Sequence, residues 1–149
     1  MLHKFTRNKI LILDAGCRTA PFSINSSKCW QIVGVDINRN ALKIAHKKAK
    51  NNRVLFMPIV CSLTSLPFKE DVFDLIICTE VIEHIKEDFL ALKNMWECLK
   101  KGSYLFLTTP NRLVIPLRNP AHVRHYDPSQ LLNILEKVNF DVLMYGRFN

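Results

Sequence analysis

The stretch Ile10-Leu-Ile-Leu-Asp-Ala-Gly-Cys17, together with the later stretch Gln31-Ile-Val-Gly-Val-Asp36, decides the fold of this chain. In each stretch a run of apolar residues leads to an acid, Asp14 in the first and Asp36 in the second. Such runs are typical of buried parallel strands, and Asp-Ala-Gly indicates a tight turn. Asp36 follows Gly16 by 20 residues, which is the spacing of a nucleotide-binding α/β unit. In such a unit the turn admits a ligand and the acid holds two ribose hydroxyls.

Strand-like runs recur along the chain, and helical patterns lie between several of them. We expect strands over residues 9–14, 31–36, 54–60, 73–78, 104–108 and 140–145, and helices over 40–51, 88–99 and 127–138. The apolar face expected for the second helix consists of Phe89, Leu92, Met95, Trp96 and Leu99. This alternation predicts an α/β fold, a Rossmann-like and mostly parallel sheet with helices on both faces. We expect one domain over residues 1–149, shortened at both ends, because the chain opens on its first strand and stops on its sixth.

The composition is that of an ordinary globular domain, with 48% hydrophobic and 23% charged residues. No stretch approaches the ~18 apolar residues of a membrane helix, and residues 1–9 lack the apolar core of a secretory signal. We therefore expect a cytoplasmic protein without a membrane span. The five cysteines form no Cys-x-x-Cys pair, which disfavours a zinc site and a disulfide framework.

The net charge of +8 raises the question of a nucleic-acid partner. The densest basic group surrounds apolar residues at helical spacing, and no aromatic residues interleave with it; it consists of Lys43, Lys47, Lys48, Lys50 and Arg53. This pattern favours a solvated helix face over a base-stacking surface.

Five blocks of sequence resemble, in order and spacing, the class I S-adenosylmethionine-dependent methyltransferases of the type 11 group. They are residues 13–17 (LDAGC), 33–37 (VGVDI), 66–68 (LPF) with 73–78 (FDLIIC), 79–84 (TEVIEH) and 105–110 (LFLTTP). The resemblance runs from Ile10 to about Tyr145. It implies S-adenosylmethionine as cofactor and transfer of the sulfonium methyl to a nucleophile, with oxygen favoured. The acceptor it implies is a small or lipid-like molecule.

The resemblance also implies roles for three residues at the ends of the first two strands. Asp14 would help to hold the methionine ammonium, in most relatives through a water molecule. Gly16 would let the backbone approach the ligand, and Asp36 would accept from both ribose hydroxyls. The alternative for Asp14 and Asp36 is that each carboxylate only caps the turn that follows it.

Four further positions are assigned by the same resemblance. Ile37 would pack on the adenine face, Ser62 and Leu63 would read the adenine edge, and the Cys78 carbonyl would face the ammonium. Ser62 stands where an aspartate is usual, so its hydroxyl would be a weaker, uncharged acceptor. The alternative for Ile37 and Cys78 is ordinary core packing.

Arg18 and Ala20 replace glycines that the family prefers, and their side chains would crowd the ligand or strain the turn. We expect Arg18 to obstruct binding, although a contact with the ligand carboxylate would have the opposite effect. The glycine-poor loop also disfavours a pyrophosphate ligand, and hence a nicotinamide-dependent oxidoreductase.

Glu80, Glu83 and His84 follow i, i+3, i+4 spacing and are expected to share one helical face. Two carboxylates and an imidazole suit a divalent cation, and some relatives with this stretch hold one. In most type 11 relatives the same residues imply no metal, so we expect none here.

His122 and His125 lie in the proline-rich segment 110–125, which is expected over the ligand crevice. One of them would take a proton from a substrate hydroxyl, or both would hydrogen-bond locally with Arg124. The sequence assigns no catalytic residue and no oligomeric state. Three alternatives stay open: an RNA methyltransferase, a nicotinamide oxidoreductase, and a catalytically silent or truncated binding domain.

Overall fold

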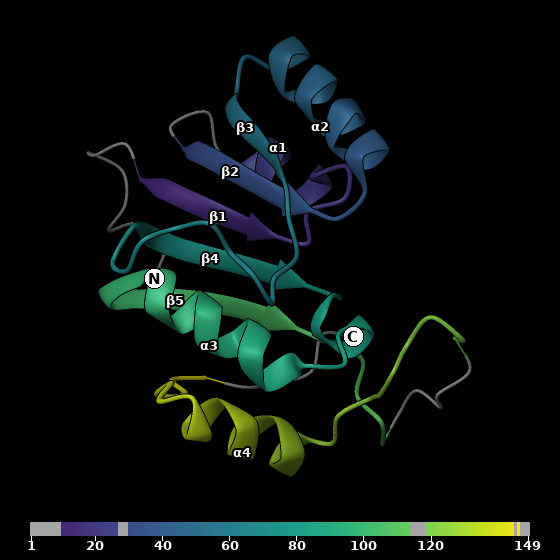
Figure 1. Ribbon diagram of the computed structural model, residues 1–149, viewed down its shortest axis with the longest axis vertical. Coiled ribbons are helices and arrows are strands. Elements are labelled where there is room, and N and C mark those ends of the chain that lie inside the picture. Colours follow the sequence, from purple (N-terminus) through teal and green to yellow (C-terminus); the bar gives the residue numbers. More distant parts are fainter. Residues whose placement is uncertain (1–9, 27–29, 114–118, 145, 147–149) are drawn as a thin grey trace.

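A computed structural model describes residues 10–26, 30–113, 119–144 and 146 and shows one sheet between two layers of helices (Figure 1). The strands are β1 (Leu11–Ala15), β2 (Gln31–Asp36), β3 (Leu55–Val60), β4 (Phe73–Thr79) and β5 (Leu99–Thr108). The helices are α1 (Pro21–Ser26), α2 (Arg39–Asn51), α3 (Asp88–Cys98) and α4 (Pro128–Lys137), with a 3₁₀ helix η2 over Ile82–His84.

The sheet has the order β3-β2-β1-β4-β5, and every neighbouring pair is parallel. The direction of strand addition reverses between β1 and β4, because β2 and β4 pair with opposite sides of β1. Asp14 stands at this reversal, in register with Gly34 on one side and Ile77 on the other. In open parallel sheets, ligands bind outside the carboxyl ends of the strands at such a point.

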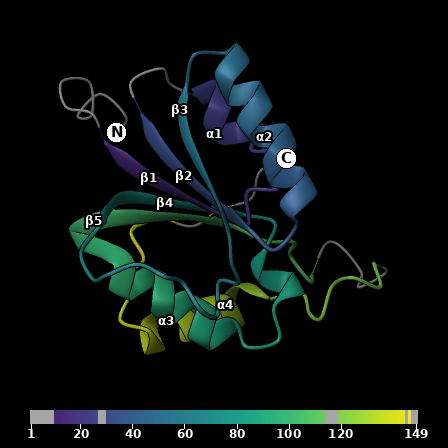
Figure 2. The same ribbon diagram turned by 45° about the horizontal axis from the view of Figure 1, so that its top comes forward.

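The helices cover both faces of the sheet, as the sequence predicts (Figure 2). On one face, residues of α1 and α2 pack with Ile32 and Phe56 in a core cluster. On the other face, the larger cluster joins α3 and α4 to β4, with Phe73 and Ile76 fully buried.

The helix ends follow from local capping. The Asn38 side chain accepts from the backbone N–H groups of Asn40 and Ala41, which starts α2. Asp127 and Gln130 form a capping box around Pro128 at the first turn of α4. Both starts agree with the predicted helices to within a residue.

The apolar face predicted for α3 is only partly right. The residues that α3 buries are Ala91, Leu92, Met95 and Cys98. Phe89 and Trp96 are instead 45% and 40% exposed. The Trp96 indole donates to the Asn139 carbonyl at 3.1 Å, beyond the end of α4. The indole therefore sits where its N–H finds a partner, at the rim of the core.

The predicted sixth strand is wrong for residues 140–144, which form no strand; Tyr145 lies outside the described residues. The Phe140 N–H donates to the Leu135 carbonyl at 3.0 Å, which binds this segment to the end of α4 instead of to β5. Beyond it, the side chains of Leu143 and Met144 are 66% and 81% exposed.

Among the described residues, no helix is long and apolar enough to cross a membrane. The described cysteines, Cys17, Cys61, Cys78 and Cys98, are free thiols.

Candidate functional site

Asp36 ends β2 with a carboxylate that the backbone holds in a fixed orientation. One oxygen accepts from the Arg18 N–H at 2.8 Å, and the other accepts from the Asn38 N–H at 2.7 Å. The side chain is 8% exposed. Each carboxylate oxygen can accept a second hydrogen bond, so the group can receive a pair of hydroxyls. The carboxylate therefore caps the turn that follows it, which is the alternative considered for Asp36, and it keeps acceptor capacity for the hydroxyls that the resemblance implies.

Asp14 is a buried carboxylate at the end of β1, only 5% exposed. The Ser23 hydroxyl donates to it at 2.5 Å. Burial raises the pKa of Asp14 to about 6, the Ser23 hydrogen bond opposes this rise, and the charge of Asp36 adds to it. No ion pair found among the described residues involves Asp14. A buried acid of this kind favours a cationic partner.

The loop after β1 begins with Gly16, which has no side chain, at the carboxyl edge of the sheet. The N–H groups of Gly16 and Cys17 both donate to the Val35 carbonyl, at 2.8 and 2.9 Å. Gly16 has φ +71°, and a Cβ there would lie 2.5 Å from a methyl of Val81. Both the conformation and the close approach require glycine.

Arg18 and Ala20 adopt left-handed conformations, with φ of 47° and 48°. Glycine takes this conformation without steric cost, whereas residues with a Cβ are strained in it. Sequence reasoning identified these two positions as glycine substitutions, and the backbone geometry gives the physical reason. The Arg18 side chain is exposed, while Ala20 is fully buried.

The residues predicted to face an adenine lie in different environments. Ile37 is 77% exposed, so an apolar side chain stands open directly after Asp36. The Ser62 hydroxyl is 2.7 Å from that of Thr64 and accepts from the Thr64 N–H at 3.2 Å, so a local turn engages it. Leu63 is 5% exposed and packs in the larger core cluster. Its side chain is therefore part of the core. Only the backbone groups of Leu63 could hydrogen-bond to an adenine edge.

Cys78 lies near the carboxyl end of β4 with its side chain fully buried. Burial raises the pKa of its thiol, and the nearby charges of Glu83 and Asp14 raise it further. These influences place Cys78 close to both carboxylates. The thiol is thus held neutral as core packing, and the predicted role of the Cys78 carbonyl concerns the backbone alone.

Glu80, Glu83 and His84 do not share one helical face, contrary to the sequence prediction. Glu80 precedes η2 in a left-handed conformation with φ 55° and accepts from the Thr108 hydroxyl at 2.9 Å. Glu83 is fully buried and accepts from Thr109 at 3.0 Å, while its second oxygen, Oε1, has no hydrogen-bond partner among the described residues. The i, i+3, i+4 rule fails here because the helical segment is a single 3₁₀ turn.

Candidate metal ligands do meet beside η2. One ligand atom each of Glu83, His84 and His122 lies within 4.8 Å of the others. His84 Nδ1 lies 2.8 Å from the Ala121 carbonyl and donates to it, so in the neutral ring Nε2 has the lone pair. Nε2 in turn lies 4.0 Å from Oε1 of Glu83, the oxygen without a hydrogen-bond donor among the described residues.

His122 has both ring nitrogens engaged by neighbours. The Asn119 amide nitrogen lies 2.9 Å from Nε2, and the Asn119 oxygen accepts from the Ala121 N–H at 3.0 Å. The amide nitrogen must therefore donate to Nε2, which leaves the proton of a neutral His122 on Nδ1. That Nδ1 lies 2.6 Å from Nε2 of His125, so His122 donates to His125.

The segment that carries these histidines is fixed against η2 and α3. The Val123 N–H donates to the Glu83 carbonyl at 2.8 Å. Arg124 forms an ion pair with Asp88 and donates to the carbonyls of Ile85 and Lys86 at 2.9 and 2.8 Å. The described part of the segment therefore lies at the carboxyl edge of the sheet, as the sequence predicts. Arg124 and the histidines form local hydrogen bonds there, which is one of the two roles considered for them.

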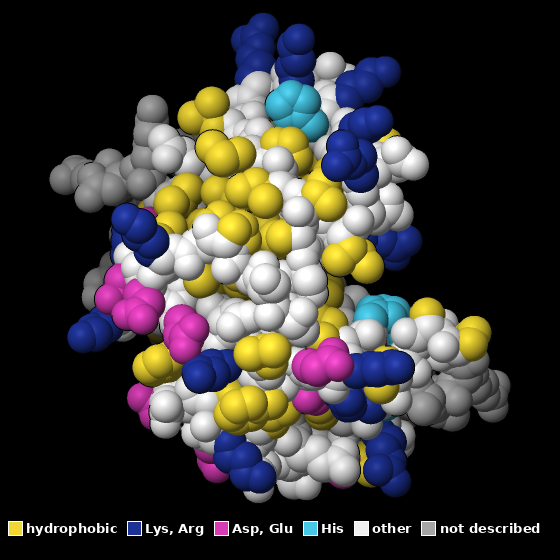
Figure 3. All heavy atoms as spheres, in the orientation of Figure 1, with side chains coloured by type: hydrophobic (Ala, Val, Ile, Leu, Met, Phe, Trp, Pro, Cys, Tyr) yellow, Lys and Arg dark blue, Asp and Glu magenta, His cyan; other side chains and the backbone are white. Residues whose placement is uncertain are grey.

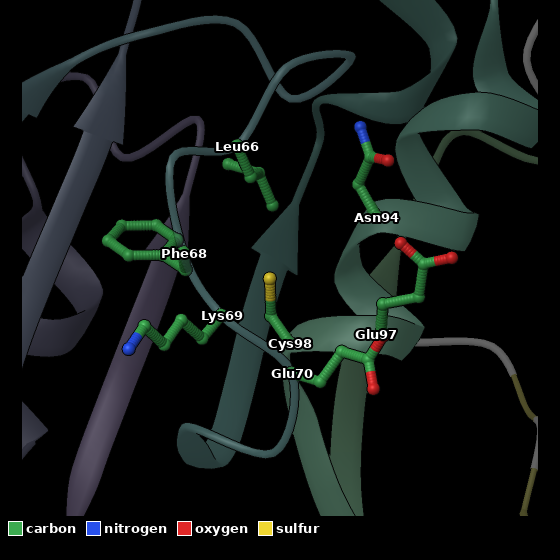
Figure 4. A pocket seen from close by; sticks show the side chains of 7 residues that line it. All are labelled: Leu66, Phe68, Lys69, Glu70, Asn94, Glu97 and Cys98. Atoms are coloured by element: carbon green, nitrogen blue, oxygen red, sulfur yellow. The ribbon is translucent and has the colours of Figure 1, made fainter.

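A hollow of about 520 Å³ lies away from these residues, between the loop 66–70 and α3 (Figure 4). Leu66, Phe68 and Cys98 form its apolar part, and the side chains of Glu70 and Glu97 lie at its rim. None of the predicted site residues lines it.

Residues 2–145 match the sequence model of the family described as "Methyltransferase domain". A probable S-adenosylmethionine-dependent methyltransferase of Mycobacterium tuberculosis, Rv3030, is 29% identical over 93% of this chain and 52% of its own length. The ubiquinone biosynthesis O-methyltransferase of Idiomarina loihiensis is 26% identical over 84% of this chain and 59% of its own. The crystal structure of the YcgJ protein from Bacillus subtilis has the same fold, with a TM-score of 0.77, 23% identity, and coverage of 89% of this chain and 62% of that one. The chain thus spans about half the length of the curated relatives it matches.

Proposed function

The chain belongs to the methyltransferase-domain family, whose cofactor is S-adenosylmethionine, and from this premise we propose that it is itself a methyl-transferring enzyme. The cofactor would bind at the carboxyl ends of β1 and β2. The sulfonium methyl would pass to a nucleophilic oxygen of a small or lipid-like acceptor. The observation that carries the proposal is the Asp36 carboxylate, oriented by two backbone N–H groups at 2.8 and 2.7 Å.

The residues around Asp36 fit the groups of this cofactor. Asp36 would accept from the two ribose hydroxyls, and the exposed Ile37 side chain would cover one face of the adenine. The backbone at Gly16 would lie against the methionine portion, in the left-handed conformation (φ +71°) that keeps this turn tight. The cationic methionine ammonium would lie near Asp14, whose buried charge lacks an ion pair among the described residues.

The bound cofactor supplies a methyl group on a sulfonium leaving group, so the protein's main task is to align the acceptor and exclude water. Asp36 and the loop at Gly16 would fix the position of the methyl donor. Ser23 holds Asp14 in place through its hydrogen bond. We assign no general base, because the hydrogen bonds of His122 engage both of its ring nitrogens within the segment 119–125.

The preference for an oxygen acceptor is supported by relatives named ubiquinone biosynthesis O-methyltransferases, at 26% and 25% identity. Oxygen is therefore the first acceptor atom to test, with phenols that carry an apolar tail as the first substrates.

Calorimetric titration with S-adenosylhomocysteine tests the cofactor site directly. We expect the wild-type chain to bind and Asp36→Ala to bind about 10- to 150-fold more weakly, since hydrogen bonds to a charged group contribute about 1.5–3 kcal/mol. The matched control is Asp141→Ala, an exposed acid in the last described segment, which should leave the affinity unchanged.

Equal affinities of wild type and Asp36→Ala would remove the basis of the site. Absence of any binding would instead favour a silent domain. An increase in the fluorescence of added NADH would favour an oxidoreductase.

A further inference from the structure

Apolar side chains of β3 lie exposed on one face of the sheet. Leu55 and Met57 are 59% and 60% exposed. They alternate with Phe56, which packs in the cluster under α2, so they point to the opposite face. In Figure 1, α3 and α4 lie over and beside β5 on this face and do not reach β3. Figure 3 shows hydrophobic side chains gathered there, over β2 and β3.

The surface beside this patch is strongly basic. Between Asp36 and Glu70 the chain has seven Lys and Arg residues and no acidic residue. Five of these cations lie on α2, and all five are exposed; they are Arg39, Lys43, Lys47, Lys48 and Lys50. Figure 3 shows Lys and Arg side chains along the end of the molecule that α2 occupies, next to the hydrophobic side chains.

Three of the five α2 cations lie on the same flank of the helix because of their spacing. Arg39, Lys43 and Lys50 stand at i, i+4 and i+11, so they share one flank of α2. The buried residues of α2 are Leu42, Ala45 and Ala49, which pack an adjacent side of the helix against the sheet. Arg53, which is also exposed, follows the helix and leads directly into β3. We call this surface, consisting of the α2 cations, Arg53, Leu55 and Met57, the α2–β3 surface.

We propose that the α2–β3 surface docks on an anionic phospholipid bilayer, with the cations against the headgroups and Leu55 and Met57 in the interface. Each Lys or Arg held near an anionic membrane contributes about 1 kcal/mol, and buried apolar area adds to this. The surface has aliphatic side chains where a single-stranded nucleic acid would need exposed aromatic ones. A second copy of the chain is disfavoured, because two such surfaces carry the same charge.

The docking does not depend on the proposed methyl transfer. Its consequence for that function is geometric, because α2 begins three residues after Asp36. A docked surface would bring the carboxyl edge of the sheet close to the bilayer, where a lipid-like acceptor would be found.

The test is co-sedimentation with vesicles of phosphatidylcholine alone and of phosphatidylcholine mixed with an equal part of phosphatidylglycerol. We expect binding to the mixed vesicles only, weakening as salt is added. The double variant Lys43→Glu/Lys50→Glu should bind at least about 30-fold more weakly, given the contribution of each cation. Leu55→Ser/Met57→Ser should also weaken binding, several-fold, with no change in net charge.

The matched control is Lys101→Glu/Lys137→Glu, which makes the same change in net charge on β5 and α4. It should retain most of the binding. Circular dichroism melting, which does not depend on cofactor binding, verifies that each variant folds. An equal loss in the control pair, no effect of the Leu55/Met57 variant, or tighter binding to single-stranded RNA than to the mixed vesicles would each overturn the proposal.

Discussion

The backbone N–H of Arg18 donates to the carboxylate of Asp36 over 2.8 Å, so the loop after β1 and the end of β2 hold each other in place. The donor at residue 18 is a main-chain N–H, so a change of the Arg18 side chain other than to proline keeps the donor. The side chain of residue 18 can therefore be substituted without removing the N–H group that orients Asp36.

Arg18→Gly should tighten the binding of S-adenosylhomocysteine, because the exposed cationic side chain stands beside the expected position of the methionine portion. With φ at 47°, the change should also raise the free energy of unfolding by up to about 1 kcal/mol, since glycine relieves the left-handed strain. Calorimetric titration and denaturant unfolding measure the two effects.

Arg53→Gly is the control for this experiment. Arg53 has φ 57° and follows α2, away from Gly16 and Asp36. It should show a similar gain in stability with unchanged affinity. Weaker binding by Arg18→Gly would show that Arg18 contacts the ligand carboxylate.

Asp14→Asn should stabilise the fold in a pH-dependent manner. The pKa of Asp14 is raised from 3.8 to about 6, so the folded state holds its proton more tightly than the unfolded state does. Stability from this group is full below pH 3.8 and is lost as the pH rises through about 6. The variant should therefore gain up to about 3 kcal/mol near neutral pH and little in acid.

Denaturant unfolding of wild type and Asp14→Asn across this pH range measures the difference. The exposed Asp141→Asn serves as the control and should show no such trend. A constant difference between wild type and Asp14→Asn at every pH would contradict the raised pKa. The affinity for S-adenosylhomocysteine should fall in acid, as Asp14 loses its charge.

Removal of divalent metal should not change cofactor binding. His122 accepts from Asn119 and donates to His125, so it has no spare lone pair for a cation beside Glu83 and His84. We expect the same thermal midpoint and the same affinity for S-adenosylhomocysteine with EDTA, magnesium or manganese. A midpoint that rises with manganese, and no longer does so in Glu83→Gln, would establish a metal site.

Gly34→Ala should destabilise the sheet by about 1–3 kcal/mol, the usual cost of overpacking a core. A Cβ at this position of β2 would lie 2.2 Å from the Phe56 ring and 3.0 Å from the Cys17 sulfur. Gly146→Ala, whose Cβ would meet no atom of the described residues within 4 Å, should be nearly neutral in the same thermal melt. A neutral Gly34→Ala would mean that Phe56 can move out of the cluster under α2.

The sequence predicts the elements whose signals are local. Apolar runs identified the strands β1 to β4 closely, and Asp127-Pro128 identified the start of α4. The helix α1 was missed, because six residues after a glycine-poor loop give no periodicity to detect. The predicted strand was wrong over residues 140–144, because an apolar run does not reveal whether a neighbouring strand is free to pair with it.

Part of the candidate site could also be predicted from local sequence signals, and part of it could not. The ends of β1 and β2 could be located from the sequence, because parallel strands bring their carboxyl ends to one edge. The hydrogen bonds that orient Asp36 and the pKa of Asp14 could not, since both depend on tertiary packing. Glu83 was recognised as a candidate ligand, but its complete burial has no signal in the spacing of Glu80, Glu83 and His84.

The pairing of β1 with β4 has a consequence for the order of folding. The strands β1, β2 and β3 can assemble as soon as residues 11–60 have left the ribosome. The other side of β1 pairs with β4, which is synthesised later. Asp74 of β4 accepts from the Leu11 N–H at 2.9 Å, and the two residues are 63 positions apart in the sequence. Closing a loop of this length is slow compared with local pairing. During synthesis the nascent chain therefore exposes an unpaired central strand, and that interval is when it is most prone to aggregate.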